Sequence, residues 1–156
     1  MMKQLIKVLI VFGLISGGCA YAGWDEHKNK KTTCLIYKND KVTYKGSCLY
    51  DHTYASAAGE GEADRNFTIK NHGKFNVYEK WYWNSNVERD ITEYKLNKKK
   101  VDVQYRDAGT LKILTPLEIE WYEEQLHEKA GSAKQTEWFT CHKYKPTKLE
   151  FCYIRQ

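Results

Sequence analysis

Proline is scarce in this chain, and the sequence motifs that mark metal sites and catalytic nucleophiles are missing. Two prolines and ten glycines in 156 residues, with 14% aromatic residues, are typical of an ordered domain and not of a disordered tail. No Cys-x-x-Cys pair is present, and the five histidines show no ligand spacing relative to the cysteines. No Gly-x-Ser-x-Gly motif marks a nucleophile elbow. We therefore expect no metal and no cofactor, and we assign no catalytic residue.

The net charge is small as well. The formal charge is +5, and it falls to +3 without the two lysines of the leader described below. That value is too low for a nucleic-acid-binding domain, which needs a strong basic patch. The charges are nevertheless clustered. Basic stretches comprise Lys28, Lys30, Lys31, Lys38, Lys41 and Lys45, and then Lys95 and Lys98 to Lys100, whereas an acidic block comprises Glu118, Glu120, Glu123, Glu124 and Glu128. Such runs are usually solvated faces, and the alternative is that one of them docks an oppositely charged macromolecule.

Long apolar runs are also missing. The uncharged run Val8–Ile15 is far shorter than the ~20 residues that a membrane-spanning helix needs. It follows Lys3 and Lys7 and precedes the small residues of Ala20-Tyr21-Ala22, which is the three-part pattern of a secretory signal. We predict a signal peptide over residues 1–22 and a single disulfide-stabilised domain over 23–156, with no integral membrane segment after cleavage.

A lipid anchor is the alternative use of the same leader. The stretch Leu14–Cys19 resembles a bacterial lipobox, although Ser16 stands where that motif has leucine. Acylation of Cys19 would leave the protein attached to a membrane surface. The short leader with early lysines is typical of bacteria, so we expect a periplasmic or secreted protein, with the lipid-anchored form as the less favoured reading.

The cysteine count becomes even once Cys19 is removed or acylated. The remaining four, in an exported small chain, predict two disulfides with three arithmetically allowed pairings. Local geometry favours Cys141 with Cys152, because Lys145–Lys148 reads as a four-residue hairpin loop that places the two cysteines opposite each other at a non-hydrogen-bonded pair.

The other two cysteines flank a second predicted hairpin. Asn39-Asp40-Lys41 reads as a turn between strands, and the pairing of Cys34 with Cys48 then needs an odd-length loop or a bulge. Gly46 is the expected bulge residue. Turn chemistry and sequence separation favour these two pairings, Cys34–Cys48 less clearly than Cys141–Cys152, and the other pairings stay open.

Most of the body alternates with a period of two residues. The expected strands are Thr33–Lys38, Val42–Leu49, a pair around the turn Asn71-His72-Gly73, one between Ile91 and Leu96, one through Val101, Val103 and Tyr105, and a terminal hairpin of 137–144 and 149–155. Lys98 to Lys100 reads as a polar connector and Thr53–Asp64 as a loop, because it is small, charged and contains glycine. We predict a mainly β (α+β) fold built as an antiparallel sheet or sandwich.

One segment changes to a helical period. Thr115-Pro116-Leu117-Glu118 matches a capping box with proline at the first helical position. We expect a helix near 116–129, in which Ile119 and Tyr122 share a face with Leu126 and Gly131 ends the helix. The alternative is a strand, because apolar residues and glutamates also alternate here.

The densest unusual feature is the aromatic block 78–83. In a strand, Trp81 and Trp83 would share one face and Tyr82 the other, so that one face would be core and the other would expose aromatic surface. We take Tyr78, Trp81, Tyr82 and Trp83 as candidate binding residues. The alternative is that all of these rings are shared between the core and a covering loop.

Three functions are compatible with these features. The first is an exported bacterial envelope protein that binds another macromolecule, and in its sharpest form an inhibitor or immunity protein, because a stapled domain loses little entropy on binding. In size, leader and staples the chain is similar to periplasmic lysozyme inhibitors and to immunity proteins of contact-delivered toxins, although its positive charge speaks against a basic lysozyme as target. The partner would be another protein, with a glycan as alternative. The second function is a small secreted enzyme or toxin using His52 or His142, and the third is a structural or adhesive envelope component. The lack of any catalytic motif favours a non-enzyme.

Overall fold

The computed structural model describes residues 23–128 and 138–155. In chain order its elements are β1 (Gly23–Lys38), β2 (Lys41–Ala57), β3 (Glu60–Ile69), β4 (Gly73–Asn84), β5 (Arg89–Leu96), β6 (Lys99–Lys100), β7 (Asp102–Asp107), α1 (Pro116–Glu128), β8 (Trp138–Tyr144), the 3-10 turn η1 (Lys145–Thr147) and β9 (Leu149–Ile154). The predicted mainly β fold with one helix is confirmed. The segment 98–100, expected as a connector, instead contributes the short strand β6.

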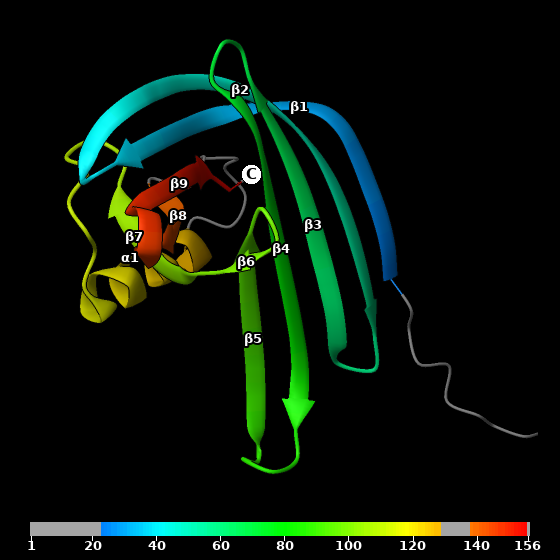
Figure 1. Cartoon of the computed structure of the whole chain (residues 1–156). Helices are drawn as coiled ribbons and strands as arrows, with labels where there is room; N and C mark the ends of the chain where they lie inside the picture. The colour runs from blue at the N-terminus through cyan, green and yellow to red at the C-terminus, as the bar shows by residue number, and fades with distance from the viewer. Residues whose placement is uncertain (1–22, 129–137, 156) are drawn as a thin grey trace, which may run out of the picture.

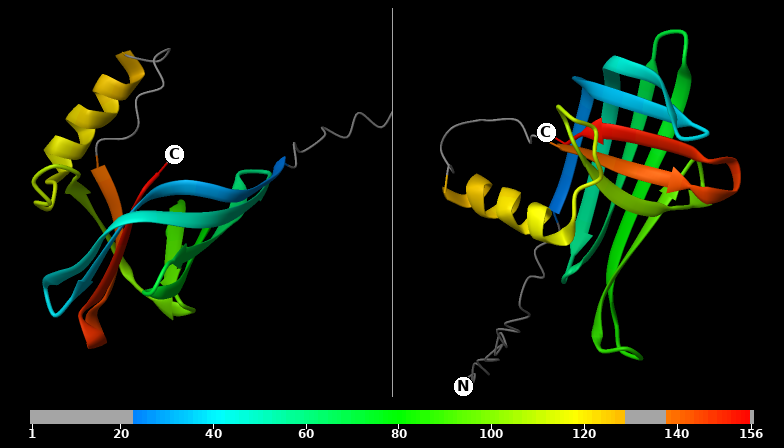
Figure 2. Two further views of the ribbon diagram at one scale, coloured as in Figure 1. Left: turned by 90° about the horizontal axis from the view of Figure 1, so that it is seen from above. Right: turned by 90° about the vertical axis from the view of Figure 1, so that its left-hand side faces the viewer.

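The strands of the described residues form one antiparallel sheet in the order β6-β5-β4-β3-β2-β1-β9-β8-β7. The sheet is rolled, because β1 and β2 curve strongly and bring β7–β9 over one face of β3–β5 (Figures 1 and 2). The rings of Phe75 in β4 and Phe151 in β9 stack with centroids 4.4 Å apart across this roll. The sequence predicted either one antiparallel sheet or a sandwich. The structure has the first, a single sheet that packs against itself.

The two edges of the sheet meet at Val101. This residue separates β6, which pairs with β5, from β7, which pairs with β8. Val101 is buried, and its N–H donates to the carbonyl of Tyr94 at 3.2 Å. The roll is closed at this point, whereas β2–β5 extend past β7–β9 on the other side (Figure 1). We call these extended parts the open end, made of 52–57, 60–65, 79–84 and 89–94.

The two faces of the sheet carry separate hydrophobic clusters. The inner face, enclosed by the roll, carries Cys34, Ile36, Cys48, Phe67, Ile69, Phe75, Val77, Leu96, Val101, Phe151 and Tyr153. The outer face carries Leu35, Tyr37, Phe139, Cys141 and Cys152. The C-terminal part of β1 (32–37) and the strands β8 and β9 are therefore buried on both faces, and burial of this apolar surface is the main force that holds the roll.

Both predicted disulfides are present. Cys141 lies directly opposite Cys152 in the β8–β9 hairpin, with Cα atoms 4.0 Å apart. The loop closes as expected around Pro146, and Lys148 completes the turn with a left-handed φ of 50°.

The pairing of Cys34 with Cys48 is confirmed, but its predicted bulge is misplaced. The register shifts between Ile36 and Tyr37, so the extra residue is Thr43 and not Gly46. Cys34 faces Gly46, and the disulfide runs diagonally to Cys48 with Cα atoms 5.8 Å apart. The bulge sits beside the tight Asn39–Asp40 turn, where both residues have positive φ, because extra twist is easiest to absorb there.

Loss of the Cys34–Cys48 disulfide should destabilise the fold substantially. Its closed loop spans a sequence separation of 14, for which chain entropy gives about 3 kcal/mol. Urea unfolding of C34A/C48A should show that decrease, and C141A/C152A should show a similar one because its separation of 11 is close. Losses below about 1 kcal/mol in both variants would contradict the chain-entropy argument.

The capping box predicted for the helix is formed. The Thr115 hydroxyl accepts from the Glu118 N–H at 3.3 Å, and the Glu118 carboxylate accepts from the Thr115 N–H at 2.7 Å. These hydrogen bonds lower the pKa of Glu118. The helix is described to Glu128, and the predicted end at Gly131 lies outside the described residues.

The predicted loop at Thr53–Asp64 is wrong. These residues complete β2 and begin β3, joined by a two-residue turn in which Ala58 and Gly59 have φ of 52° and 84°. The small residues serve packing instead: a Cβ on Gly61 would come within 2.3 Å of the Trp81 ring. A glycine required by a neighbouring indole has the same appearance in sequence as a glycine required by a loop.

The two disulfides indicate an oxidising environment, outside the cytosol. Among the described residues, no helix has the length and apolar character needed to cross a membrane. The predicted signal peptide, including Cys19, lies outside the described residues.

Candidate binding surface

Besides Tyr94, which packs against the inner cluster, the inner face of the open end carries three large aromatic side chains. Tyr54 of β2 and Trp81 of β4 have ring centroids 5.4 Å apart at an interplanar angle of 28°. Trp83 follows two residues after Trp81 on the same face and is 53% exposed. Neither hydrophobic cluster of the described residues includes any of these rings. We call Tyr54, Trp81 and Trp83 the aromatic platform.

Trp81 leans against the sheet because Gly61, its cross-strand partner in β3, has no side chain. A Cβ on Gly61 would lie 2.3 Å from Cζ2 and 2.8 Å from Cε2 of the Trp81 indole, so the ring occupies the space that a side chain would need. Gly61 therefore fixes the ring in a low position over the backbone of β3. The strands β2, β3 and β4 hold the platform by backbone pairing on both sides, so little order has to be gained when a ligand binds.

A charged cluster separates the platform from the inner core. Glu79 Oε2 accepts from Arg65 Nη1 at 3.1 Å and from Arg155 Nη2 at 2.6 Å. The Arg65 and Glu79 side chains are only 8% and 13% exposed. Arg65 also lies over the ring of Tyr153, 5.9 Å from its centroid. This network spans β3, β4 and the end of β9, and so it fixes the two walls of the roll relative to each other directly below the platform.

His142, one of the two histidines considered for catalysis, is sealed in the roll. It is 1% exposed, it stacks on Tyr153 with centroids 5.8 Å apart at 4°, and neither ring nitrogen has a hydrogen-bond partner among the described residues. Burial, with a smaller effect of Arg65 and Arg155, lowers its pKa to about 3. The imidazole is therefore neutral at physiological pH and out of reach of a substrate.

His52 lies on β2 beside Arg65. Burial, followed by the charges of Arg65 and His27, lowers its pKa, against an opposing effect of Asp25. Its Nε2 also has no hydrogen-bond partner among the described residues. A general base needs a group that orients it and a substrate within reach. Among the described residues, neither His52 nor His142 has a hydrogen-bonded partner that would orient it in this way.

The four predicted binding residues are divided between the two faces. Trp81 and Trp83 lie on the inner face as expected from their spacing, whereas Tyr78 and Tyr82 lie on the outer face. The Tyr78 hydroxyl donates to Glu62 at 2.6 Å, and this hydrogen bond raises its pKa to about 12. The Tyr82 hydroxyl donates to Glu93 at 3.1 Å. That these four residues form one binding site stays a prediction, and the structure divides them into two pairs on opposite faces of β4.

Tyr54, the third member of the platform, was not predicted from the sequence. It fell in the segment expected to be a loop, where a tyrosine has no partner. The available signal was the spacing of two residues between Tyr54 and Ser56 and between Gly61 and Ala63. Tyr54 pairs with Ala63 and Ser56 pairs with Gly61, and cross-strand partners share a face.

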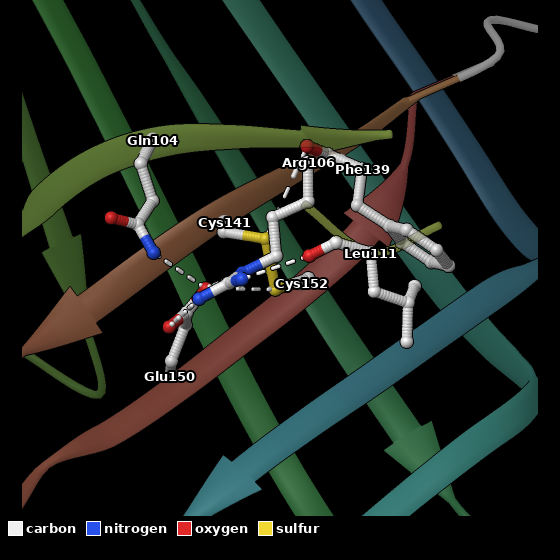
Figure 3. Close-up of a disulfide and its surroundings, with 7 residues drawn as sticks. All are labelled: Gln104, Arg106, Leu111, Phe139, Cys141, Glu150 and Cys152. Atoms are coloured by element: carbon white, nitrogen blue, oxygen red, sulfur yellow. Dashed lines mark hydrogen bonds and ion pairs between the residues drawn. A yellow bond between two sulfur atoms is a disulfide. The ribbon is translucent and has the colours of Figure 1, made fainter. Parts of the chain in front are cut away.

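A second cluster lies on the outer face around the Cys141–Cys152 disulfide (Figure 3). The buried Glu150 accepts from Arg106 Nε at 2.6 Å and Nη2 at 3.0 Å, and from Gln104 at 2.8 Å. Glu150 Oε1 also lies 3.6 Å from Cys152 Sγ. Cys141, Glu150 and Cys152 are close enough together to suggest a metal site, but each sulfur is bonded to the other, so we read the cluster as structural.

Comparisons with protein-family models, with curated proteins and with solved structures found no match. The functional argument therefore rests on the surfaces of this chain alone.

Proposed function

We propose that this chain is an exported bacterial envelope protein that binds another protein through the aromatic platform, and that it acts as an inhibitor or an immunity protein. The observation that carries the proposal is the platform itself: Tyr54, Trp81 and Trp83 gather on the inner face of the open end, outside both hydrophobic clusters of the described residues. Tryptophan and tyrosine are the residues most enriched at the energetic centres of protein interfaces.

The scaffold below the platform supports this reading. Two disulfides and the Arg65–Glu79–Arg155 network limit how far the strands can move, so a partner meets a surface that is already ordered. The same disulfides suit the periplasm or the exterior, to which the predicted leader would direct the chain. Retention through an acylated Cys19 is the alternative to a free periplasmic protein.

Loss of the platform should abolish tight binding without loss of the fold. The full mature chain is used to capture proteins from envelope extract, and the affinity of the purified partner is then measured for wild type and W81A/W83A. Two interface centres of this kind predict a Kd raised by about 30-fold or more.

The matched control is W24A, because Trp24 is 72% exposed and lies on the outer face, where it pairs with Ala55. It should bind like wild type. Equal affinity of W81A/W83A and wild type would refute the platform as the binding surface. Binding of wall-derived oligosaccharides in place of a protein would reassign the platform to a glycan, and hydrolysis of such a ligand would favour a secreted enzyme.

A further inference from the structure

The helix α1 presents a second surface, away from the platform. It stands beside the edge strand β7 and clear of β3–β5 (Figure 2). Tyr122 anchors it to the sheet: its hydroxyl donates to Asp107 at 2.9 Å, and its ring packs edge-to-face on Trp138 with centroids 5.4 Å apart. Ile119, three residues before Tyr122, is half-buried on the same side. Ile119 and Tyr122 thus lie on the inward face predicted from the helical period, and the side chain of its third predicted member, Leu126, lies outside what the structure describes.

The outward face of α1 combines exposed apolar and acidic side chains. Leu117 is 77% exposed and Trp121 is 55% exposed, and the two are four residues apart on one side of the helix. Glu120 and Glu124 fall three and seven residues after Leu117, so they lie on the same side and are exposed as well.

The apolar surface continues beyond the helix. Ile113, 52% exposed, shares with Trp121 the wall of a hollow of about 540 Å³ between α1 and the segment that precedes it. Leu117 lies outside the hollow, one helical turn before Trp121. Isolated exposed apolar residues are normal, but three large ones close together favour an interaction surface.

The charge of α1 is opposite to that of the chain. Its sequence contains five glutamates and no lysine or arginine, whereas the whole chain carries a formal charge of +5. Among the described residues, no ion pair involves Glu120, Glu123 or Glu124. An anionic lipid surface or a nucleic acid would be repelled by this helix, and a parallel or antiparallel copy of it would be repelled as well.

We propose that the outward face of α1 docks a basic protein, with Trp121 and Leu117 as its apolar anchors and Glu120 and Glu124 as its charge-matching residues. The net positive charge of the whole chain would repel a basic target such as a lysozyme. The local charge of α1 is negative and would attract one. This goes beyond the platform, because the two surfaces lie on different elements and are tested by different variants.

The test uses the full chain expressed in bacterial cells, with photoreactive p-benzoylphenylalanine in place of Leu117. The control carries the same residue at Val42, which is also apolar and exposed, at the tip of the β1–β2 hairpin. On irradiation, position 117 should give an adduct with a basic protein, identified by mass spectrometry, and position 42 should give none. In the same background E120K/E124K should remove the adduct.

With the identified protein purified, W121A should raise the Kd by about 30-fold or more. E120Q/E124Q should raise it by about tenfold at low salt and by less at about 0.3 M salt, where exposed charges are screened.

Three results would overturn the inference: no adduct from position 117, an adduct with a neutral or acidic protein, or an adduct that E120K/E124K does not remove. An adduct of twice the chain mass would assign this face to a second copy and overturn it too. The two proposals can also be told apart. If a partner is captured through Trp81 and Trp83 but position 117 gives no adduct, the platform proposal stands and this one is refuted.

Discussion

Replacement of Arg106 by methionine should lower the free energy of unfolding by about 3–5 kcal/mol. The substitution keeps the length of the side chain but leaves the Glu150 carboxylate, only 2% exposed, without its cation. Removal of one partner from a buried ion pair costs more than the pair contributes, because the remaining charge is still excluded from water. Urea unfolding at neutral pH measures the effect directly.

The geometry makes Arg106 hard to replace. Its guanidinium donates from Nε and Nη2 to the two carboxylate oxygens of Glu150, and from Nη1 to the carbonyl of Leu111 at 2.9 Å. It also lies 4.4 Å from the centroid of the Tyr37 ring. One side chain thus joins β7, β9 and β1 on the outer face, beside the Cys141–Cys152 disulfide (Figure 3). Lysine, with a single ammonium group, could not make these contacts together.

A double-mutant cycle separates charge from packing. If the cost arises from the stranded carboxylate, R106M/E150M should be more stable than R106M by at least about 1 kcal/mol, because both charges are then gone. The matched control is R89M, at an exposed arginine of β5, which should stay within about 0.5 kcal/mol of wild type. A double variant no more stable than R106M would show that packing on Tyr37, and not the charge, is the cause.

Local chemistry made the hairpins and the helix predictable. The Cys141–Cys152 pairing follows from a four-residue loop around Pro146, and the start of α1 follows from Thr115 and Glu118. Each feature is determined by residues within about a dozen positions of one another. The roll of the sheet is different. Closure at Val101 requires β7 to pair with β8, which lies far beyond it in the sequence, while β6 pairs with the adjacent β5, and no local pattern encodes the distant pairing.

The candidate surface was predictable only in part, for a related reason. The alternation in 78–83 correctly put Trp81 and Trp83 on one face, but not which face would be enclosed by the roll. Tyr54 and Gly61 were misread because their neighbours are small and charged, and their role depends on an indole from another strand. Propensity fails here where a tertiary contact determines the residue type.

Acid should destabilise this protein well before its carboxylates are protonated, and His142 should be the main cause. The pKa of His142 is about 3 in the folded state, below the ordinary value of 6.5, so the unfolded chain binds a proton that the folded chain excludes. The stability from the neutral form is complete above pH 6.5 and is lost as the pH falls from 6.5 toward 3. Each pH unit within that window should cost up to about 1.4 kcal/mol.

His142 cannot relieve this cost by finding a partner for its proton. It packs on Tyr153 of β9 and Tyr94 of β5, whose own pKa values are raised by burial, and the nearest charges that act on it are the cations Arg65 and Arg155. An imidazolium here would be buried beside two guanidiniums, so its protonation is coupled to opening of the roll. His52, with its pKa lowered by burial and by Arg65, should add a smaller contribution of the same sign.

The measurement is the free energy of urea unfolding at several pH values between 7.5 and 4.5. H142F keeps an aromatic ring at the site but cannot titrate, so its stability should depend less steeply on pH than that of wild type. The H72F variant is the matched control, because His72 is exposed in the turn before β4, and it should keep the wild-type slope. If H142F disturbs the fold, NMR titration of wild type serves instead, where the His142 ring protons should not shift down to pH 4.5. Equal slopes for H142F and wild type, or titration of His142 near pH 6.5, would show that water reaches the inner face and that the roll is not closed as described.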